Sequence, residues 1–151
     1  MLKGIDPIIT PELLKVLAEM GHGDEIVVAD ANFTAASLGA GKPLLHLAGV
    51  GVARAVEAVM SLLPVDQDVT HPVAYMQVSH QPDGWRSALQ RHVISQLTEQ
   101  GYALENQIAA VERFAFYERV KQAYAIVLTS ELQPYGNFIV KKGVICEPLA
   151  G

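Results

Sequence analysis

The sequence of 151 residues lacks the features that mark several common classes of protein. It contains a single cysteine, which excludes an intrachain disulfide and a cysteine-based zinc cluster. No basic run occurs, and 11 lysines and arginines stand against 16 aspartates and glutamates, for a net charge of −5. Nucleic acid and anionic membranes are therefore poor partners for this chain.

Long hydrophobic runs are also missing. No apolar stretch approaches the ~18 residues that a membrane span requires. Asp6 and two prolines interrupt the first fourteen residues, so the start does not resemble a signal peptide, and we expect a cytoplasmic protein. Half of the residues are nevertheless hydrophobic, at 50%. That richness favours an oligomer, in which subunit contacts bury additional apolar surface.

Helical and strand patterns alternate along the chain. Thr10 as N-cap and Pro11 in the first helical position predict a helix that ends near Gly21. Further strands are expected at 25–29, 43–48, 73–79, 107–111 and 125–130, helices at 52–63, 83–100 and 113–124, and a hairpin or bent strand at 137–145. This alternation predicts one α/β domain, residues 1–151, with three layers: helices cover both faces of a mainly parallel or mixed sheet.

Two glycine-containing segments resemble nucleotide-binding turns but lack required residues. In GVGVAR, at 49–54, Arg54 replaces the third glycine of a dinucleotide-binding turn. Around GAGKP, at 39–43, Ala36 replaces the first glycine of a phosphate loop, and Pro43 replaces the Ser or Thr that holds magnesium. We therefore expect no nucleotide cofactor.

The five histidines do not form a metal-binding pattern. There is no H-x-x-x-H pair and no local cluster. His22 with Asp24 or Asp30 could supply ligands, which leaves a metal as a minor hypothesis, and we expect none.

His22 lies between Gly21 and Gly23, after the first predicted helix and before the strand at 25–29. It could interact with the carboxyl end of that helix as a protonated side chain. It could equally be a general acid/base that the glycines leave accessible, with Asp30 nearby at the tip of the strand. Spacing alone does not decide between these interpretations.

Two later segments are similarly ambiguous. The aromatic residues between Arg113 and Tyr117 suit a core or an interface as well as a site. The Tyr135-Gly136-Asn137 segment after Pro134 is typical of a turn before a strand. The three segments gain meaning only when they are considered together.

Taken together, MLKGIDPIITPELLKVLAEMGHGDEIVVADANF, RFAFYERVKQAYAIVLTSE and YGNFIVKKGVI resemble the D-ribose pyranase / L-fucose mutarotase family. The pattern G-H-G-D-x-[IV]-x-x-x-D-x-x-F followed by a late Y-G-N carries the resemblance, and R-F-x-F-Y-E-R points to the fucose branch. The resemblance implies a ribose pyranase-like fold and a cofactor-independent isomerase of sugar anomers or ring forms. It also implies a decamer of stacked pentamers with active sites at subunit contacts.

The resemblance also implies roles for individual residues. His22 matches the general acid/base, and Tyr117 is an additional hydroxyl near the anomeric centre. The residues that match sugar-binding positions are Asp30, Arg113, Tyr135, Gly136 and Asn137. The expected partner is a monosaccharide, L-fucose or a related sugar. Two alternatives stay open: a non-catalytic sugar-binding accessory protein and a purely structural oligomer.

Overall fold

A six-stranded mixed sheet forms the centre of the computed structural model, which describes residues 1–151. The strands are β1 (Glu25–Ala29), β2 (Leu44–Leu47), β3 (Val73–Met76), β4 (Ile108–Val111), β5 (Ala125–Thr129) and β6 (Phe138–Lys141), in the spatial order β2-β5-β1-β6-β3-β4. β6 runs antiparallel to both neighbours, β1 and β3, and the other neighbouring pairs are parallel. The carboxyl ends of β1 and β3 therefore meet the beginning of β6 at one edge of the sheet.

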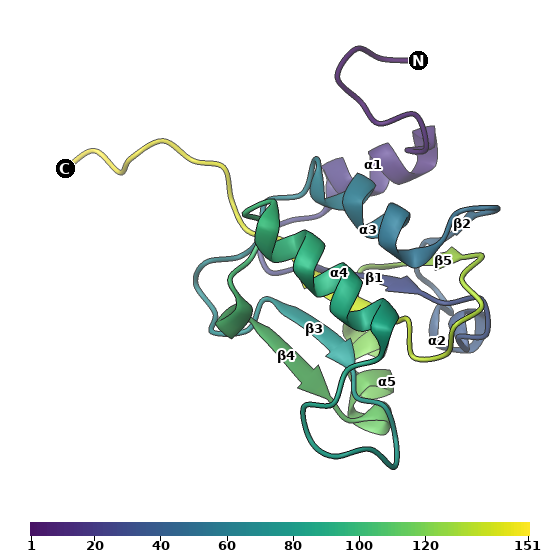
Figure 1. Ribbon diagram of the computed structural model, residues 1–151. Coiled ribbons are helices and arrows are strands. Elements are labelled where there is room, and N and C mark those ends of the chain that lie inside the picture. The colour runs from purple at the N-terminus through teal and green to yellow at the C-terminus, as the bar shows by residue number, and fades with distance from the viewer.

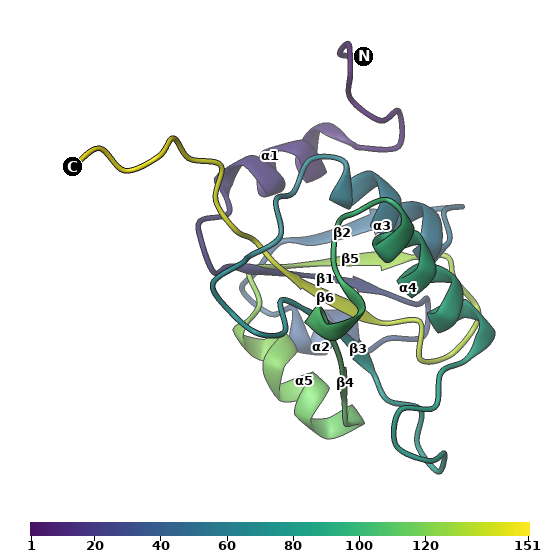
Figure 2. The same cartoon turned by 60° about the vertical axis from the view of Figure 1, so that its left-hand side comes forward.

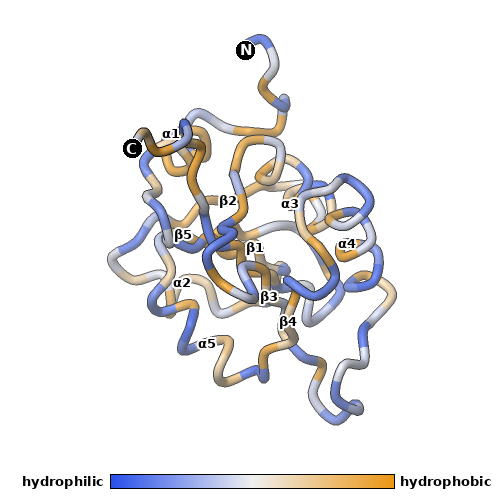
Figure 3. The backbone as a smooth tube through the Cα atoms, turned by 90° about the vertical axis from the view of Figure 1, so that its left-hand side faces the viewer, coloured by the Kyte–Doolittle hydropathy of each residue, from blue (hydrophilic) through white to orange (hydrophobic).

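Helices cover both faces of this sheet, as Figure 1 and Figure 2 show. α1 (Pro11–Glu19), α3 (Val52–Met60) and α4 (Ala88–Glu99) lie on one face, and α2 (Ala35–Leu38) and α5 (Arg113–Gln122) lie on the other. A core of 26 buried residues lies under the first set and a core of 11 under the second. Apolar residues accordingly concentrate in the central strands (Figure 3). The predicted three-layer α/β fold is confirmed.

Helix boundaries follow the capping residues. Thr10 Oγ1 accepts a hydrogen bond from the backbone N–H of Leu13 at 3.1 Å, so α1 begins where it was predicted. α4 begins at Ala88, later than predicted, because Ser87 and Gln90 form a reciprocal capping box there. None of the helices has both the length and the apolar character needed to cross a membrane.

Of the two forms expected for 137–145, a hairpin or a bent strand, the hairpin is wrong, whereas a strand is present. β6 is a single strand that ends at Lys141, and the chain continues past Val65 instead of turning back. Gly143 allows this close passage, since an added Cβ would lie 2.6 Å from the carbonyl oxygen of Val65. The strand predicted at 73–79 is shorter in the structure, where β3 ends at Met76.

Candidate active site

A pocket of about 220 Å³ opens at the sheet edge where β1 and β3 end and β6 begins. It is lined by Asp30, Asn32, Phe33, Met76, Arg113, Tyr117, Pro134, Tyr135 and Asn137. The structure thus brings together five residues that were expected to form a site but are spread over more than a hundred positions. Gly136, the sixth, lies between two of the lining residues and contacts Asp30 through its backbone.

Asp30 and Asn137 form the buried polar floor of this pocket, and each is only 3% exposed. The backbone N–H of Asp30 donates to Oδ1 of Asn137 at 2.9 Å, and the backbone N–H of Gly136 donates to Oδ2 of Asp30 at 3.2 Å. Burial raises the pKa of the Asp30 carboxyl, and the backbone N–H of Asn32 partly offsets that effect. These bonds fix the orientation of the two polar side chains before any ligand arrives.

The first turn of α5 supplies one wall of the pocket. Glu112 caps the helix by accepting hydrogen bonds from two backbone N–H groups, so that Arg113 and Tyr117 lie one turn apart on the same face. Nε of Arg113 donates to the hydroxyl oxygen of Tyr117 at 2.9 Å, which leaves the hydroxyl proton free for another acceptor. The ring of Phe33 lies 5.7 Å from that of Tyr117 and adds an apolar surface.

The segment that carries Tyr135 is held in a strained conformation. Tyr135 has a φ of 62°, which is rare for a bulky side chain. Gln90 of α4 is fully buried, and its Nε2 donates to the carbonyl oxygens of Tyr135 at 3.0 Å and Met76 at 2.8 Å. We did not identify Gln90 from the sequence, although the Ser87-x-x-Gln90 capping pattern was a signal for its location.

His22 does not lie in this pocket. It precedes β1, whereas Asp30 follows it, and a strand of five residues extends about 17 Å. The expectation that Asp30 lies near His22 is therefore wrong within one chain. His22 instead lines a separate pocket of about 480 Å³, whose walls are mainly apolar and include Leu14, Leu17, Leu62 and Ile145.

Two carboxylates surround His22 in that second pocket. Its Nε2 lies 3.1 Å from Oδ1 of the buried Asp66 and 3.5 Å from Oδ2 of the exposed Asp68. The carbonyl groups of Leu17 and Met20 at the carboxyl end of α1 accept hydrogen bonds from Lys142 Nζ. A lysine, and not His22, thus donates hydrogen bonds to this helix end.

The GHGD turn keeps the imidazole accessible. The backbone N–H of Gly21 donates to Oδ2 of Asp24 at 2.7 Å, and Gly23 adopts a φ of 86°. The side chain of His22 at the tip of this turn is 45% exposed. Gly21 itself does not need a positive φ, so only one of the two glycines is required by the backbone conformation.

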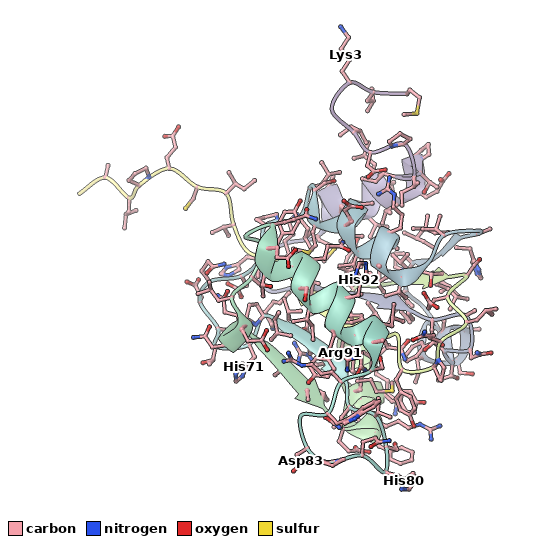
Figure 4. The ribbon with its side chains drawn as sticks, in the orientation of Figure 1. Lys3, His71, His80, Asp83, Arg91 and His92 are labelled. Carbon is pink, nitrogen blue, oxygen red and sulfur yellow. The ribbon has the colours of Figure 1, made fainter.

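The other histidines do not join either pocket. His71, His80 and His92 lie on separate parts of the outer surface (Figure 4), and His46 is exposed on β2. The only grouping with ligand potential for a metal is His22, Asp66 and Asp68, whose ligand atoms lie within 4.8 Å of one another. Every buried side-chain polar atom of the chain has a hydrogen-bond partner, so no orphaned ligand atom indicates an ion.

The sequence of this chain matches a known family over nearly its whole length. The match to the RbsD / FucU transport protein family spans residues 3–145. The chain belongs to this family. An L-fucose mutarotase of Actinobacillus pleuropneumoniae is 47% identical over 144 residues, which cover 95% of this chain and 97% of the relative. The fucose mutarotase of Homo sapiens is 43% identical over 147 residues, which cover 95% and 94%.

A solved structure of this RbsD / FucU family supports the same grouping. The crystal structure of the fucose mutarotase from Streptococcus pneumoniae in complex with L-fucose superposes with a TM-score of 0.86 and 39% sequence identity. The superposition covers 96% of this chain and all of that chain. The predicted fold and the predicted fucose branch of the family are both confirmed.

Proposed function

We propose that this family member is a cofactor-independent sugar mutarotase, an isomerase that interconverts the α and β anomers of L-fucose or a related monosaccharide. The observation that carries the proposal is the convergence of Asp30, Arg113, Tyr117 and Asn137 on one small pocket. Its volume of about 220 Å³ lies below the ~300–1,000 Å³ of sites for drug-sized ligands and suits one monosaccharide. Relatives with 42–47% identity bear the name fucose mutarotase.

The residues of the pocket suit a polyhydroxylated ligand. Asp30 accepts hydrogen bonds from sugar hydroxyls, Arg113 and Asn137 can donate to them, and the ring of Phe33 packs against C–H groups. The Tyr135-Gly136-Asn137 segment holds the rim of the pocket. The proposed reaction requires no redox centre and no phosphate group.

Mutarotation requires two proton transfers at the anomeric centre. One group removes the proton of the anomeric hydroxyl while another protonates the ring oxygen, and the ring opens to an aldehyde. C1 then rotates and the ring closes by the reverse transfers. We assign these roles to His22 and to the hydroxyl of Tyr117, and such catalysis is typically worth ~10²- to 10⁴-fold. Exchange of pyranose and furanose forms passes through the same open chain.

We further propose that each active site combines two subunits. His22 lies at the opposite end of β1 from the pocket, so a second copy of the chain must supply it. We call the sugar pocket and the surroundings of His22 the two half-sites. An exposed apolar side chain lies beside each of them: Phe114 beside Arg113 is 66% exposed, and Ile145 beside His22 is 87% exposed. Burial of these side chains between copies would bring the half-sites together, and a decamer of stacked pentamers, as the family resemblance implies, is the assembly we propose.

The whole chain, residues 1–151, would act as one domain in this assembly. Its single cysteine, Cys146, is unpaired, which suits a reducing compartment. We therefore propose that the enzyme works in the cytoplasm.

Saturation-difference proton NMR on equilibrated sugars tests the activity. One anomeric signal is irradiated and transfer to the other is followed for L-fucose, D-ribose, L-rhamnose and D-galactose. We expect transfer for L-fucose, reduced about 10²- to 10⁴-fold in His22→Ala. Saturable line broadening without transfer would instead favour a sugar-binding accessory protein, and no binding at all would favour a structural oligomer.

A mixture of two inactive variants tests the shared site. His22→Ala and Arg113→Ala each disable one half-site, so each variant alone should be inactive. In randomly mixed oligomers about a quarter of the sites would combine two intact halves, and a corresponding fraction of activity should return. Absence of recovery in oligomers shown to be mixed would rule out the shared site and leave the mutarotase activity itself standing.

A further inference from the structure

An ion pair joins two residues that the sequence motifs contain but the proposed reaction does not use. Glu25 begins β1 directly after the GHGD turn, and Arg119 ends the R-F-x-F-Y-E-R motif on α5. We propose that these two are positioning residues: their ion pair fixes the rotation of α5 about its own axis and thereby places Arg113 and Tyr117 in the sugar pocket. The inference rests on the proposed function, because it concerns the same pocket, and it assigns a role to two residues outside the pocket walls.

The guanidinium group of Arg119 holds the carboxylate of Glu25 through several hydrogen bonds. Nε of the arginine donates to Oε1 at 3.2 Å and to Oε2 at 3.0 Å, and Nη2 also donates to Oε2. The two side chains are only 25% and 11% exposed, so solvent screens their attraction less than it screens that of a surface pair. A planar fork with more than one contact fixes the direction of the side chain as well as its distance, which a single ammonium group does not.

The apolar packing of α5 does not by itself fix the rotation of the helix. Phe116 and Val120 are its only buried residues, and because they are four positions apart they form one narrow stripe. Figure 2 shows the helix on the face of the sheet opposite α1, α3 and α4. A helix that rests on a single stripe can roll about that stripe with little change in buried apolar area. The polar contacts on its flanks therefore determine its rotation.

Arg119 and Tyr117 lie on opposite flanks of the buried stripe. Residues two positions apart are separated by about 160° around a helix of 3.6 residues per turn, and the stripe lies between these two. Both are half-buried, whereas Glu118 between them is exposed. Arg113 lies on the same flank as Tyr117, since its Nε donates to the tyrosine hydroxyl. A constraint on Arg119 therefore sets how far the opposite flank reaches into the sugar pocket.

Another contact at the carboxyl end of α5 resists this rotation less. Nζ of Lys42 donates to the carbonyl oxygens of Val120 at 2.6 Å and Lys121 at 2.9 Å. These carbonyl groups belong to the backbone, which lies only ~2.3 Å from the helix axis, whereas the guanidinium of Arg119 acts at the end of a long side chain. The ion pair thus has the longer lever arm, and the lysine mainly holds the end of the helix in place.

A small rotation of α5 is enough to impair the pocket. At the outer radius of a helix, ~5–6 Å, a roll of ~10° displaces a side chain by ~1 Å. A misplacement of that size can lower a rate by ~10²-fold. We therefore expect Arg119→Met and Glu25→Met to lower the ratio of the maximal exchange rate to the half-saturation concentration of L-fucose by about 10- to 100-fold. The half-saturation concentration should itself rise, because Arg113 binds the sugar in the proposed site.

The experiment measures NMR exchange and urea unfolding for these variants and for the double variant Glu25→Met/Arg119→Met. The double variant should show the loss of one single variant and not the product of two, because the residues act as a unit. It should also fold where a single variant does not, since no charge is left buried and unpaired. Arg119→Lys keeps the charge but not the fork, so its urea midpoint should stay near that of the unmodified protein while its half-saturation concentration rises.

Arg54→Met is the matched control. The guanidinium of Arg54 on α3 holds the carboxylate of Asp6 through two hydrogen bonds of 2.6 Å, and neither residue lines the sugar pocket. This variant loses a similar pair and should keep its half-saturation concentration within about twofold.

The outcomes separate the inference from the proposed function. Variants of Glu25 and Arg119 that lose stability but keep the half-saturation of the Arg54→Met control overturn the inference and leave the mutarotase standing. Multiplied losses in the double variant also overturn it, because the two residues would then act independently. An unmodified protein that binds L-fucose without exchange refutes the mutarotase, and the half-saturation of line broadening then tests the inference by the same comparison. No binding at all refutes both.

Discussion

Replacement of Gln90 by leucine should weaken both the fold and the sugar pocket. Leucine is similar in size and keeps the packing of α4, but it cannot donate to the carbonyl oxygens of Met76 and Tyr135. A buried polar group left without its partner costs about 1–3 kcal/mol, and the bond to Met76 is fully buried whereas that to Tyr135 is partly exposed. We therefore expect Gln90→Leu to lower the free energy of unfolding by about 2–4 kcal/mol.

The effect on the pocket follows from the strain at Tyr135. A residue held at a φ of 62° stores about 1–3 kcal/mol, and the hydrogen bond from Gln90 helps to maintain it. Once that bond is lost, the segment relaxes and the pocket must be re-formed on binding. We expect the half-saturation concentration of L-fucose to rise about tenfold, which corresponds to ~1.4 kcal/mol.

Urea unfolding and the NMR exchange assay measure the two effects separately. Gln96→Leu is the matched control, because Nε2 of Gln96 on the same helix donates to the carbonyl of Ala53 at 3.1 Å, outside the pocket. This control should lose about 1 kcal/mol of stability and keep its sugar affinity. If Gln90→Leu matched the control in both measurements, the argument that Gln90 positions the Tyr135 segment would be refuted.

Substitutions at three further positions test other parts of the structure. Burial raises the pKa of the Asp30 carboxyl above its ordinary value of 3.8, so just above that pH the native state keeps a proton that the unfolded chain has released. The free energy of unfolding should therefore fall as the pH rises from about 4, and the Asp30→Asn variant should lack this fall in urea unfolding. The same pH dependence of stability in both proteins would contradict the argument. Gly143→Ala should lose about 1–3 kcal/mol in the same assay, because its Cβ would overlap the carbonyl of Val65, whereas an unchanged stability would mean that the segment shifts freely. Thr10→Ala should lose about 1 kcal/mol through its bond to Leu13, and Thr10→Ser should not.

Elements with local signals were predictable from the sequence. The Thr10-Pro11 pair determines where α1 begins, and the β-branched run at 25–29 forms a buried strand, as expected. The start of α4 was predicted too early because Trp85 fits helical spacing, although the capping box at Ser87 sets the boundary. The turn expected at Lys142-Gly143 did not form because the glycine serves a close contact with a distant segment, which spacing does not reveal.

The candidate site was also predictable only in part. Asp30 and Asn137 flank strands whose ends meet at one edge, so their proximity follows from the topology once the order of strands is known. The contacts of Asp66 and Gln90 were not predictable, since each spans more than forty residues of the chain, although the Ser87-x-x-Gln90 capping pattern indicated where Gln90 lies on α4. The separation of His22 from Asp30 was already implied by the predicted strand at 25–29, because five extended residues between them span about 17 Å.

The short strand β6 limits the changes in chain length that this fold can tolerate. Its first residues follow Asn137 in the proposed sugar pocket, and the carbonyl oxygen of its last residue, Lys141, accepts the backbone N–H of Asp66, which lies beside His22. Both of its edges are paired, so it has no free side along which a shifted register could be absorbed. Deletion of one residue between 138 and 141 would turn its side chains to the opposite face and displace both half-sites together. An insertion in the exposed loop at 80–85, by contrast, changes the register of no strand.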